Sequence, residues 1–316
     1  MFMTLGYHHL LAPLDGSELA EQALPHAQAI AQRAGARITL LQVIPNVAAL
    51  AQEPALPPGR LTAALYTQTL QSQWQEQALA ALEQTAQSLA DQGVMAQAAV
   101  VVAHPPDGIL DYAQTQAVDL IVMSTHGRSG LARWVYGSVA ARVVQAAPCP
   151  VLLIRTVAGQ TTPAPRKILV TLDGSGLSTR ALPEAERLAR LFKAEIVLLH
   201  VVADSYEQKL RHVPPSLAPE VAAYTSNMLE RRIAQVTVEQ EGIAADLQAR
   251  GVAARSAVLT GDPVQTILDY AASESVELIA MATHGRSGMA RMLHGSVAER
   301  VLHDTPCPLL LVHATA

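Results

Sequence analysis

The chain has 316 residues, 50% of them hydrophobic and 16% charged, so it is long enough for two domains and too apolar to be disordered. The formal net charge of -5 and the aromatic content of 3% argue against nucleic acid as a partner, because nucleic-acid sites are basic and often rich in aromatic side chains. The sequence has no apolar run of about 18 residues, which predicts that it does not cross a membrane.

The N-terminus and the cysteines favour a cytoplasmic protein. Residues 1–9 lack the basic segment, apolar core and cleavage site of a signal peptide. The two cysteines, Cys149 and Cys307, each lie in a Pro-Cys-Pro sequence, and the chain has no CxxC motif. We therefore expect two buried thiols, with neither a disulfide framework nor a metal site.

The sequence repeats itself once, at a constant offset. Asp15 and Asp173 are 158 positions apart, and the same offset separates Cys149 from Cys307. Solenoid repeats have periods of about 20–50 residues, so a period this long indicates a duplicated domain. We predict two domains, 1–157 and 165–316, joined by a linker rich in Thr, Pro and Gly.

In chain order, the first half is predicted to alternate strands and helices. Strands are expected at 9–14, 37–44, 96–103, 118–123 and 149–154, and helices at 18–34, 61–92, 107–116 and 139–146. The second half repeats them, with strands at 167–172, 195–202, 253–260, 276–281 and 307–312, and helices at 178–192, 218–250, 264–273 and 297–304. The long proline-containing segments 45–60 and 203–216 are expected to be loops, which serve as lids, partner contacts or plain surface connections.

This alternation predicts two tandem, doubly wound, open parallel sheets of five strands each. The strands are almost continuously apolar, as in parallel sheets that are covered by helices on both faces. Crossovers between parallel strands are right-handed, and ligands bind beyond the carboxyl ends of the strands, where the strand order reverses.

One glycine-rich segment lies between the fourth strand and the last helix of each half. Residues 125–130 and 283–288 both read Thr-His-Gly-Arg-Ser-Gly, and residues 137–140 and 295–298 both read Gly-Ser-Val-Ala. Glycines let a ligand approach the backbone, and a helix start offers free N–H groups to an anion. An anion cradle is favoured over a simple tight turn because the same residues recur in both copies.

The first strand of each half runs into an Asp-Gly-Ser sequence, at Asp15 and Asp173. A carboxylate at the carboxyl end of a buried strand either starts the turn and caps the next helix or contacts a ligand. The sequence leaves both roles open.

The glycine-rich segments resemble the nucleotide-binding signature of the universal stress protein family. That signature is Gly, two residues, Gly, nine residues, Gly, then Ser or Thr; here Gly127 and Gly137-Ser138, with Gly285 and Gly295-Ser296, match its later part. Ser124 and Ala282 replace its first glycine. The resemblance covers nearly the whole chain, once per half.

The resemblance implies that each half binds ATP or another adenine nucleotide, with or without Mg²⁺. It places Asp15 and Asp173 at the ribose or base side, and the backbone of Val43 and Val201 at the adenine. It also implies that the last strands of the two domains pair and that a homodimer is possible. The other residues assigned to the nucleotide are Gly127, Arg128, Gly130, Gly137, Ser138, Val139, Gly261, Gly285, Arg286, Gly288, Gly295, Ser296 and Val297.

The sequence contains no catalytic motif. It has no P-loop, no GxSxG and no HExxH, so we expect a nucleotide-binding stress-response regulator rather than an enzyme. Two alternatives remain: a universal stress protein that has lost nucleotide binding and acts through protein contacts, and a slow ATPase. The second half, which has Gly261 where the first has Ala103, is the better candidate site.

Overall fold

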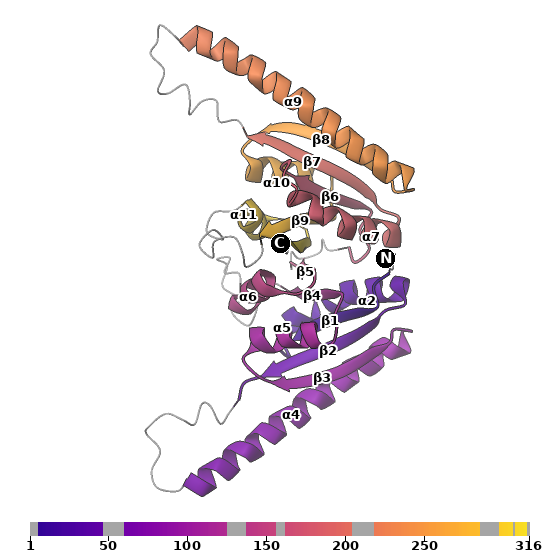
Figure 1. Cartoon of the computed structure of the whole chain (residues 1–316). Coiled ribbons are helices and arrows are strands. Elements are labelled where there is room, and N and C mark those ends of the chain that lie inside the picture. The colour runs from indigo at the N-terminus through magenta and orange to yellow at the C-terminus, as the bar shows by residue number, and fades with distance from the viewer. Residues whose placement is uncertain are drawn as a thin grey trace. The chain divides into compact units, whose positions relative to one another are not determined.

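The chain forms two compact units, Met1–Ala158 and Gly159–Ala316, in a computed structural model that describes residues 6–46, 60–124, 137–155, 162–203, 218–284, 297–305 and 307–314 (Figure 1). The described residues contain ten strands that alternate with helices, five strands in each unit. This confirms the predicted fold class.

In the first unit the strands lie in the order β3-β2-β1-β4-β5, and all neighbours are parallel. The strands are β1 (His9–Leu14), β2 (Arg37–Ile44), β3 (Ala96–Val102), β4 (Leu120–Ser124) and β5 (Val151–Ile154). The helices are α1 (Glu18–Glu21), α2 (Leu24–Ala34), α4 (Arg60–Asp91), α5 (Pro105–Thr115) and α6 (Ser138–Ala146).

The second unit repeats this arrangement with the strand order β10-β9-β6-β7-β8, again parallel throughout. Its strands are β6 (Lys167–Leu172), β7 (Glu195–Ala203), β8 (Ala254–Gly261), β9 (Leu278–His284) and β10 (Leu309–Ala314). Its helices are the 3-10 helix η1 (Ser178–Ala181), α7 (Leu182–Phe192), α9 (Ala218–Ala249), α10 (Pro263–Ser273) and α11 (Val297–Asp304).

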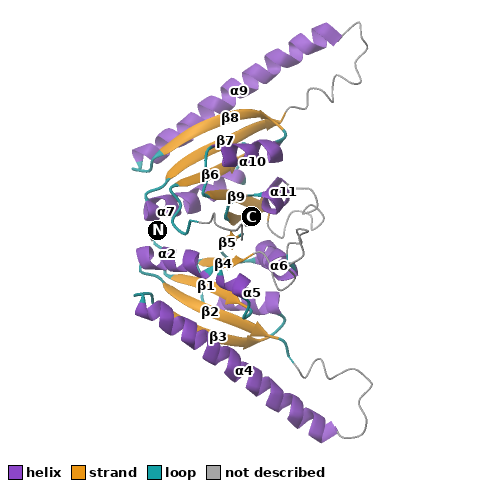
Figure 2. Ribbon diagram, turned by 180° about the vertical axis from the view of Figure 1, so that it is seen from behind, coloured by secondary structure: helices purple, strands orange, loops and turns teal. Residues whose placement is uncertain are grey.

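The direction of the crossovers changes once in each unit. From β1 the chain moves outward to β2 and β3, and then returns to the other side of β1 to form β4 and β5. Because the crossovers are right-handed, α2 and α4 cover one face of the sheet, and α5 and α6 cover the other (Figure 2). All six residues of β1 are buried, as expected for a strand covered on both faces.

The first predicted helix of each half is divided in two. Leu24–Ala34 and Leu182–Phe192 begin as new helices with Pro25 and Pro183 in their first turns. A proline in a first turn lacks only an N–H group that has no helical partner there, so it marks a helix start. The predicted stop at Gly35 is confirmed, since this residue adopts the left-handed conformation with φ 66°.

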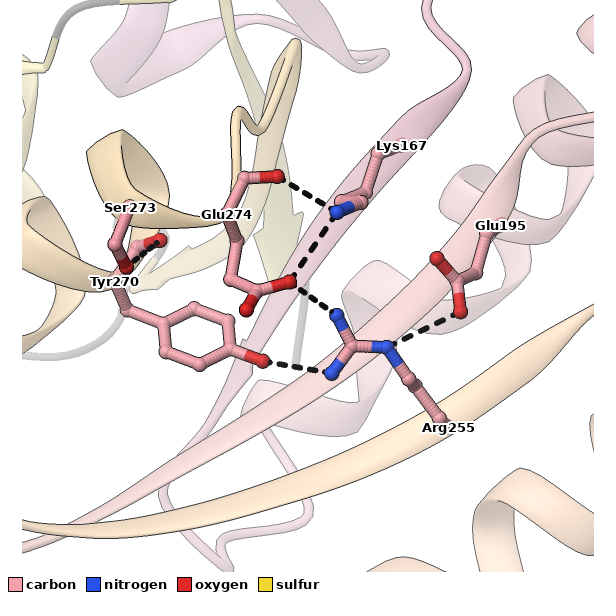
Figure 3. A network of polar contacts seen from close by, with 6 residues as sticks. All are labelled: Lys167, Glu195, Arg255, Tyr270, Ser273 and Glu274. Carbon is pink, nitrogen blue, oxygen red and sulfur yellow. Dashed lines mark hydrogen bonds and ion pairs between the residues drawn. The ribbon is translucent and has the colours of Figure 1, made fainter.

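A network of charged side chains joins the amino ends of three strands in the second unit (Figure 3). The Arg255 guanidinium donates to Glu195 at 3.1 Å, to the Tyr270 hydroxyl at 2.9 Å and to Glu274 at 2.6 Å. Lys167 donates to the backbone carbonyl of Glu274 at 2.6 Å and to its carboxylate at 3.2 Å. The hydrogen bond from Lys167, opposed by burial and assisted by the charge of Arg255, lowers the pKa of Glu274.

The first unit holds the same strand ends together with a buried histidine. His9, in the position of Lys167, contacts the Thr39 hydroxyl through Nε2 at 2.8 Å, and Gln97 donates to that hydroxyl at 2.9 Å. The Arg37 guanidinium lies 3.0 Å from His9 Nδ1. Burial lowers the pKa of His9, and the charge of Arg37 acts in the same direction. The two units therefore have the same backbone fold, but different polar contacts at the amino ends of their strands.

Helix α5 packs closely against the carboxyl end of β2. A Cβ atom added at Gly108 would lie 2.8 Å from Val43 Cγ1 and 3.1 Å from the Ala103 Cβ. In the second unit Thr266 stands in place of Gly108, and Gly261 in place of Ala103. There a Cβ atom added at Gly261 would lie 2.8 Å from Thr266 Oγ1. Each unit therefore has one glycine at this contact, on the helix in the first and on the strand in the second.

The first testable consequence concerns acid stability. His26, in α2, is 4% exposed, and burial lowers its pKa from 6.5 to about 4. The unfolded chain therefore takes up the proton first, so His26 favours folding fully above about pH 6.5 and loses this contribution as the pH falls toward 4. Between about pH 7.5 and about pH 5, we expect the free energy of unfolding to fall by about 2 kcal/mol through His26 alone.

Substituting His26→Leu should remove most of this fall. Urea titrations followed by tryptophan fluorescence suit the measurement, because both tryptophans, Trp74 and Trp134, belong to the first unit. His8 is exposed and lies directly before β1, so it supplies the control: His8→Gln should keep the wild-type pH dependence of the free energy of unfolding. Equal pH dependence in His26→Leu and wild type would contradict the expectation.

The second consequence concerns two helical glycines. Alanine improves an exposed helix by about 1 kcal/mol over glycine, but overpacking a tight contact costs about 1–3 kcal/mol. At Gly108 the cost of overpacking against the stiff, β-branched Val43 should exceed the gain in helix propensity. Gly108→Ala should therefore lower the free energy of unfolding by about 1 kcal/mol. Gly242 in α9 has no described atom within 4 Å of an added Cβ, so Gly242→Ala should raise it.

Chemical denaturation of the two variants beside wild type measures both effects. If Gly108→Ala has the same free energy of unfolding as Gly242→Ala, the expected cost of overpacking between α5 and β2 is contradicted.

Candidate functional site

The candidate site of the first unit lies where the strand order reverses. β1 and β4 are parallel neighbours, with Leu10 opposite Leu120, so their carboxyl ends lie at the same edge of the sheet. β1 runs into Asp15, β4 ends at Ser124, and α6 begins at Ser138. This is the edge at which doubly wound sheets bind ligands.

Asp15 is exposed and organises the turn after β1. Its Oδ1 atom accepts from the Ser17 backbone N–H at 3.0 Å and from the Ser17 hydroxyl. Ser17 in turn caps α1, since its Oγ accepts from Ala20 N–H at 3.1 Å. Both contacts of Asp15 are made through Oδ1, which leaves Oδ2 able to accept from a ligand. Of the two roles left open by the sequence, the capping role belongs to Ser17, and Asp15 orients the cap.

Asp173 occupies the equivalent turn of the second unit. Its Oδ1 accepts from the Ser175 N–H at 2.8 Å, and its own N–H donates to the Ser178 hydroxyl at 3.3 Å. Burial would raise the pKa of Asp173, but the hydrogen bonds from Ser175 and Ser178 outweigh it and lower the pKa. Asp173 is therefore an ionised acceptor at neutral pH.

The first turn of α6 carries no negative charge that would repel an anion. Its N-cap is Gly137, which has no side chain that could cap the helix, and the turn contains no acidic residue. Ser138 is exposed and is the first helical residue, so it does not cap the helix; Val139 follows it in the first turn. Backbone N–H groups at such a start carry the positive end of the helix dipole.

Val43 and Val201 lie near the carboxyl ends of the second strand of each sheet. Val43 pairs with Val101 of β3, and Val201 pairs with Leu259 of β8. The Val43 side chain faces α5, where Gly108 makes room for it. The structure thus brings both residues to the predicted edge, and whether their backbone groups contact adenine remains a prediction.

Gly261 ends β8 with φ 142°, a conformation that residues with a side chain rarely adopt. The next residue, Asp262, caps α10 by accepting from Val264 N–H at 3.1 Å and from Gln265 N–H at 3.0 Å. In the first unit His104 occupies this position and makes no such cap. The replacement of Ala103 by Gly261 therefore changes the backbone conformation at this corner, since Gly261 has a positive φ and Ala103 does not.

Several predicted residues fall outside the described part of the chain, and their roles stay predictions. They are Gly127, Arg128, Gly130, Gly285, Arg286, Gly288, Gly295 and Ser296. Val297 is the first residue of α11. Most of the two long loop segments, 45–60 and 203–216, also lie outside the described ranges.

Sequence reasoning missed two residues beside Asp173. His200 of β7 is buried beneath the carboxyl edge, and Arg232 of α9 lies near it. Aligning the halves at the offset of 158 would have revealed them, because Gln42 and Trp74 stand in their places in the first half.

The described part of the site supplies acceptors and donors for a ligand. Exposed carboxylates follow the first strands, and the exposed Ser138 hydroxyl begins α6, whose first turn has no acidic residue. Among the described residues, no group of three His, Cys, Asp or Glu side chains could hold a metal ion, and no helix combines the length and apolar character needed to span a bilayer.

Known proteins resemble this chain in sequence over one unit or more, and in fold over nearly its whole length. Universal stress protein YxiE of Bacillus subtilis is 32% identical over 151 residues, covering 46% of this chain and 97% of its own. Universal stress protein Rv2005c of Mycobacterium tuberculosis is 27% identical over 203 residues, covering 61% of each chain. A universal stress protein structure from Archaeoglobus fulgidus has the same fold, with a TM-score of 0.69, 19% identity and 98% of both chains covered.

The family model gives the assignment for each half. Residues 6–155 and 165–313 both match the Universal stress protein family. The chain therefore belongs to the universal stress protein family, in a tandem form with two copies of its domain.

Proposed function

We propose that this protein binds an adenine nucleotide, with ATP as the first candidate, at the carboxyl strand ends of each unit. The observation that supports this most is that β1 delivers an exposed carboxylate, Asp15, to the edge where α6 begins with no side-chain cap and no acidic residue in its first turn. A nucleotide needs both chemistries, since its phosphates accept hydrogen bonds and its ribose hydroxyls donate them.

The phosphates would lie against the first turn of α6, with Ser138 as an additional donor. Free N–H groups at a helix start bind phosphate, and the helix dipole favours negative charge there. Asp15 would accept from the ribose at the other side of the edge. The second unit offers Asp173 and the start of α11 at the same places.

Binding without efficient turnover agrees best with the residues present. The sequence has no P-loop lysine and neither of the hydrolase motifs GxSxG and HExxH. Occupancy would then act as a signal in a stress response. A universal stress protein with a solved structure is in complex with cAMP, but the proposal for this chain rests on its own residues.

A second candidate function is supported by a departure from the nucleotide-binding signature. Ser124 and Ala282 stand where the signature has its first glycine, so the backbone there is less able to approach a ligand. A protein of this kind would act through protein contacts alone, without nucleotide.

Binding of ATP to the purified full chain, measured by isothermal titration with and without Mg²⁺, separates these functions. The sharpest variant is Ser138→Asp. An acidic residue in a first turn stabilises a helix by about 0.3–1 kcal/mol, yet it repels phosphate. We therefore expect Ser138→Asp to keep or raise thermal stability while weakening ATP binding to the first unit at least about tenfold.

Ser296→Asp is the matched change in the second unit, and Gln73→Glu, on the exposed side of α4, controls for the added charge. Mass spectrometry of the freshly isolated protein would identify a co-purified nucleotide. Absence of ATP and ADP binding at millimolar concentration would leave the function through protein contacts as the better account.

A further inference from the structure

The second unit carries a polar cluster beside Asp173 that the first unit lacks. We name it the His200 cluster; it consists of Asp173, Gly174, His200 and Arg232. Asp173 and Gly174 follow β6, His200 lies in β7 opposite Leu172 of β6, and Arg232 comes from α9. All four therefore meet at the edge where the nucleotide is proposed to bind.

His200 has a buried ring nitrogen with unused hydrogen-bonding capacity. The residue is 4% exposed, and its Nδ1 atom has no hydrogen-bond partner among the described residues. A buried polar nitrogen without a partner is destabilising, and such groups are rare in native proteins. A ligand atom at Nδ1 would satisfy it.

Arg232 and His200 both approach the turn after β6. A Cβ atom added at Gly174 would lie 3.4 Å from Arg232 Nη2 and 3.5 Å from His200 Cε1. Gly174 has φ 80°, so glycine serves the turn and also keeps this place free of a side chain. Arg232 is exposed, and its guanidinium has no ion-pair partner within the described ranges. The cluster therefore extends from the buried Nδ1 to the surface.

The equivalent turn of the first unit keeps the carboxylate, at Asp15, but lacks the imidazole and the guanidinium. Gly16 has nearly the same conformation, with φ 76°, but no described atom lies within 4 Å of an added Cβ there. Gln42 and Trp74 replace His200 and Arg232. Because the first unit forms the same turn and sheet without them, the two side chains are not required by the fold.

The charges near His200 favour a neutral ring. Burial lowers the pKa of His200 and the charge of Arg232 lowers it further, against the opposite effects of Asp173 and Glu239. A neutral imidazole presents one donor and one acceptor, Arg232 only donates, and Asp173 only accepts. Two adjacent hydroxyl groups, each able to donate and accept, match this set better than an anion, which would face the carboxylate of Asp173.

We propose that His200 and Arg232 bind the hydroxyl groups of the nucleotide ribose together with Asp173, and so make the second unit the tighter of the two sites. This inference rests on the nucleotide binding proposed above. One hydroxyl donates to Asp173 and accepts from Arg232, and its neighbour occupies His200 Nδ1. The first unit has Asp15 and the neutral Gln42 amide for this part of the ligand, without a cation. Since a hydrogen bond to a charged group contributes the equivalent of about tenfold or more in affinity, the two sites should differ by at least that factor.

The test compares ATP with 2′,3′-dideoxy-ATP, which lacks both hydroxyls, by isothermal titration of the full chain. The Ser138→Asp background weakens the first site further, so that the tighter phase of the titration reports on the second. There, Arg232→Ala and His200→Gln should each weaken ATP binding about tenfold but leave binding of the dideoxy nucleotide unchanged. Trp74→Ala, the matched change in the first unit, should leave the second site unaffected.

Arg232 is exposed, so Arg232→Ala should fold even if His200→Gln does not. In protein labelled isotopically at histidine, the NMR signal of the His200 ring Cε1–H group should shift when ATP is added. This signal is identified by its absence from the spectrum of the His200→Gln variant. Equal affinity of wild type and Arg232→Ala for ATP would overturn this inference and leave nucleotide binding intact. Failure of ATP to bind wild type at all would overturn both proposals.

Discussion

The covering of each parallel sheet by helices on both faces is the constraint on which the rest of this protein depends. All six residues of β1 are buried, and so are most residues of the strands beside it. A charged group has no place in such a layer unless it is paired, so polar chemistry is confined to the two ends of the strands. At the carboxyl ends of the central strands the crossovers lead to opposite faces of the sheet, and there exposed carboxylates and the starts of helices come to the same edge.

The two ends of the sheet have diverged in different ways since the domain was duplicated. At the amino ends, polar side chains join neighbouring strands in both units. The first unit uses a buried histidine, and the second uses a Lys–Glu–Arg network. These alternatives are interchangeable because only the strand connection matters. At the carboxyl ends, Gln42 and Trp74 correspond to His200 and Arg232, and neither pair is needed to hold the strands. This is the difference that the proposed ribose contacts of the second unit would explain.

Packing explains a further difference between the units. The contact between α5 and β2 holds one glycine, on the helix at Gly108; the second unit moves the glycine to the strand end at Gly261. A fixed volume between the helix and the strand ends accepts either arrangement, because the side chain absent from one partner makes room on the other. The exchange also sets the backbone at the corner of the site, since Gly261 adopts a positive φ that Ala103 need not adopt.

The duplication, the order and type of most elements, the parallel sheets and the family could be predicted from the amino-acid sequence. These are properties of local pattern: apolar runs, proline and glycine positions, and a repeat that needs no geometry to be seen. The placing of Asp15, Val43 and Gly137 at the carboxyl edge of the sheet also followed from the strand assignments alone. The three-dimensional arrangement was needed to show that Ser17 rather than Asp15 caps α1, and that a histidine and an arginine 32 positions apart meet beside Gly174. Such contacts depend on how α9 lies over β7, and no local pattern encodes the distance between two side chains on different elements.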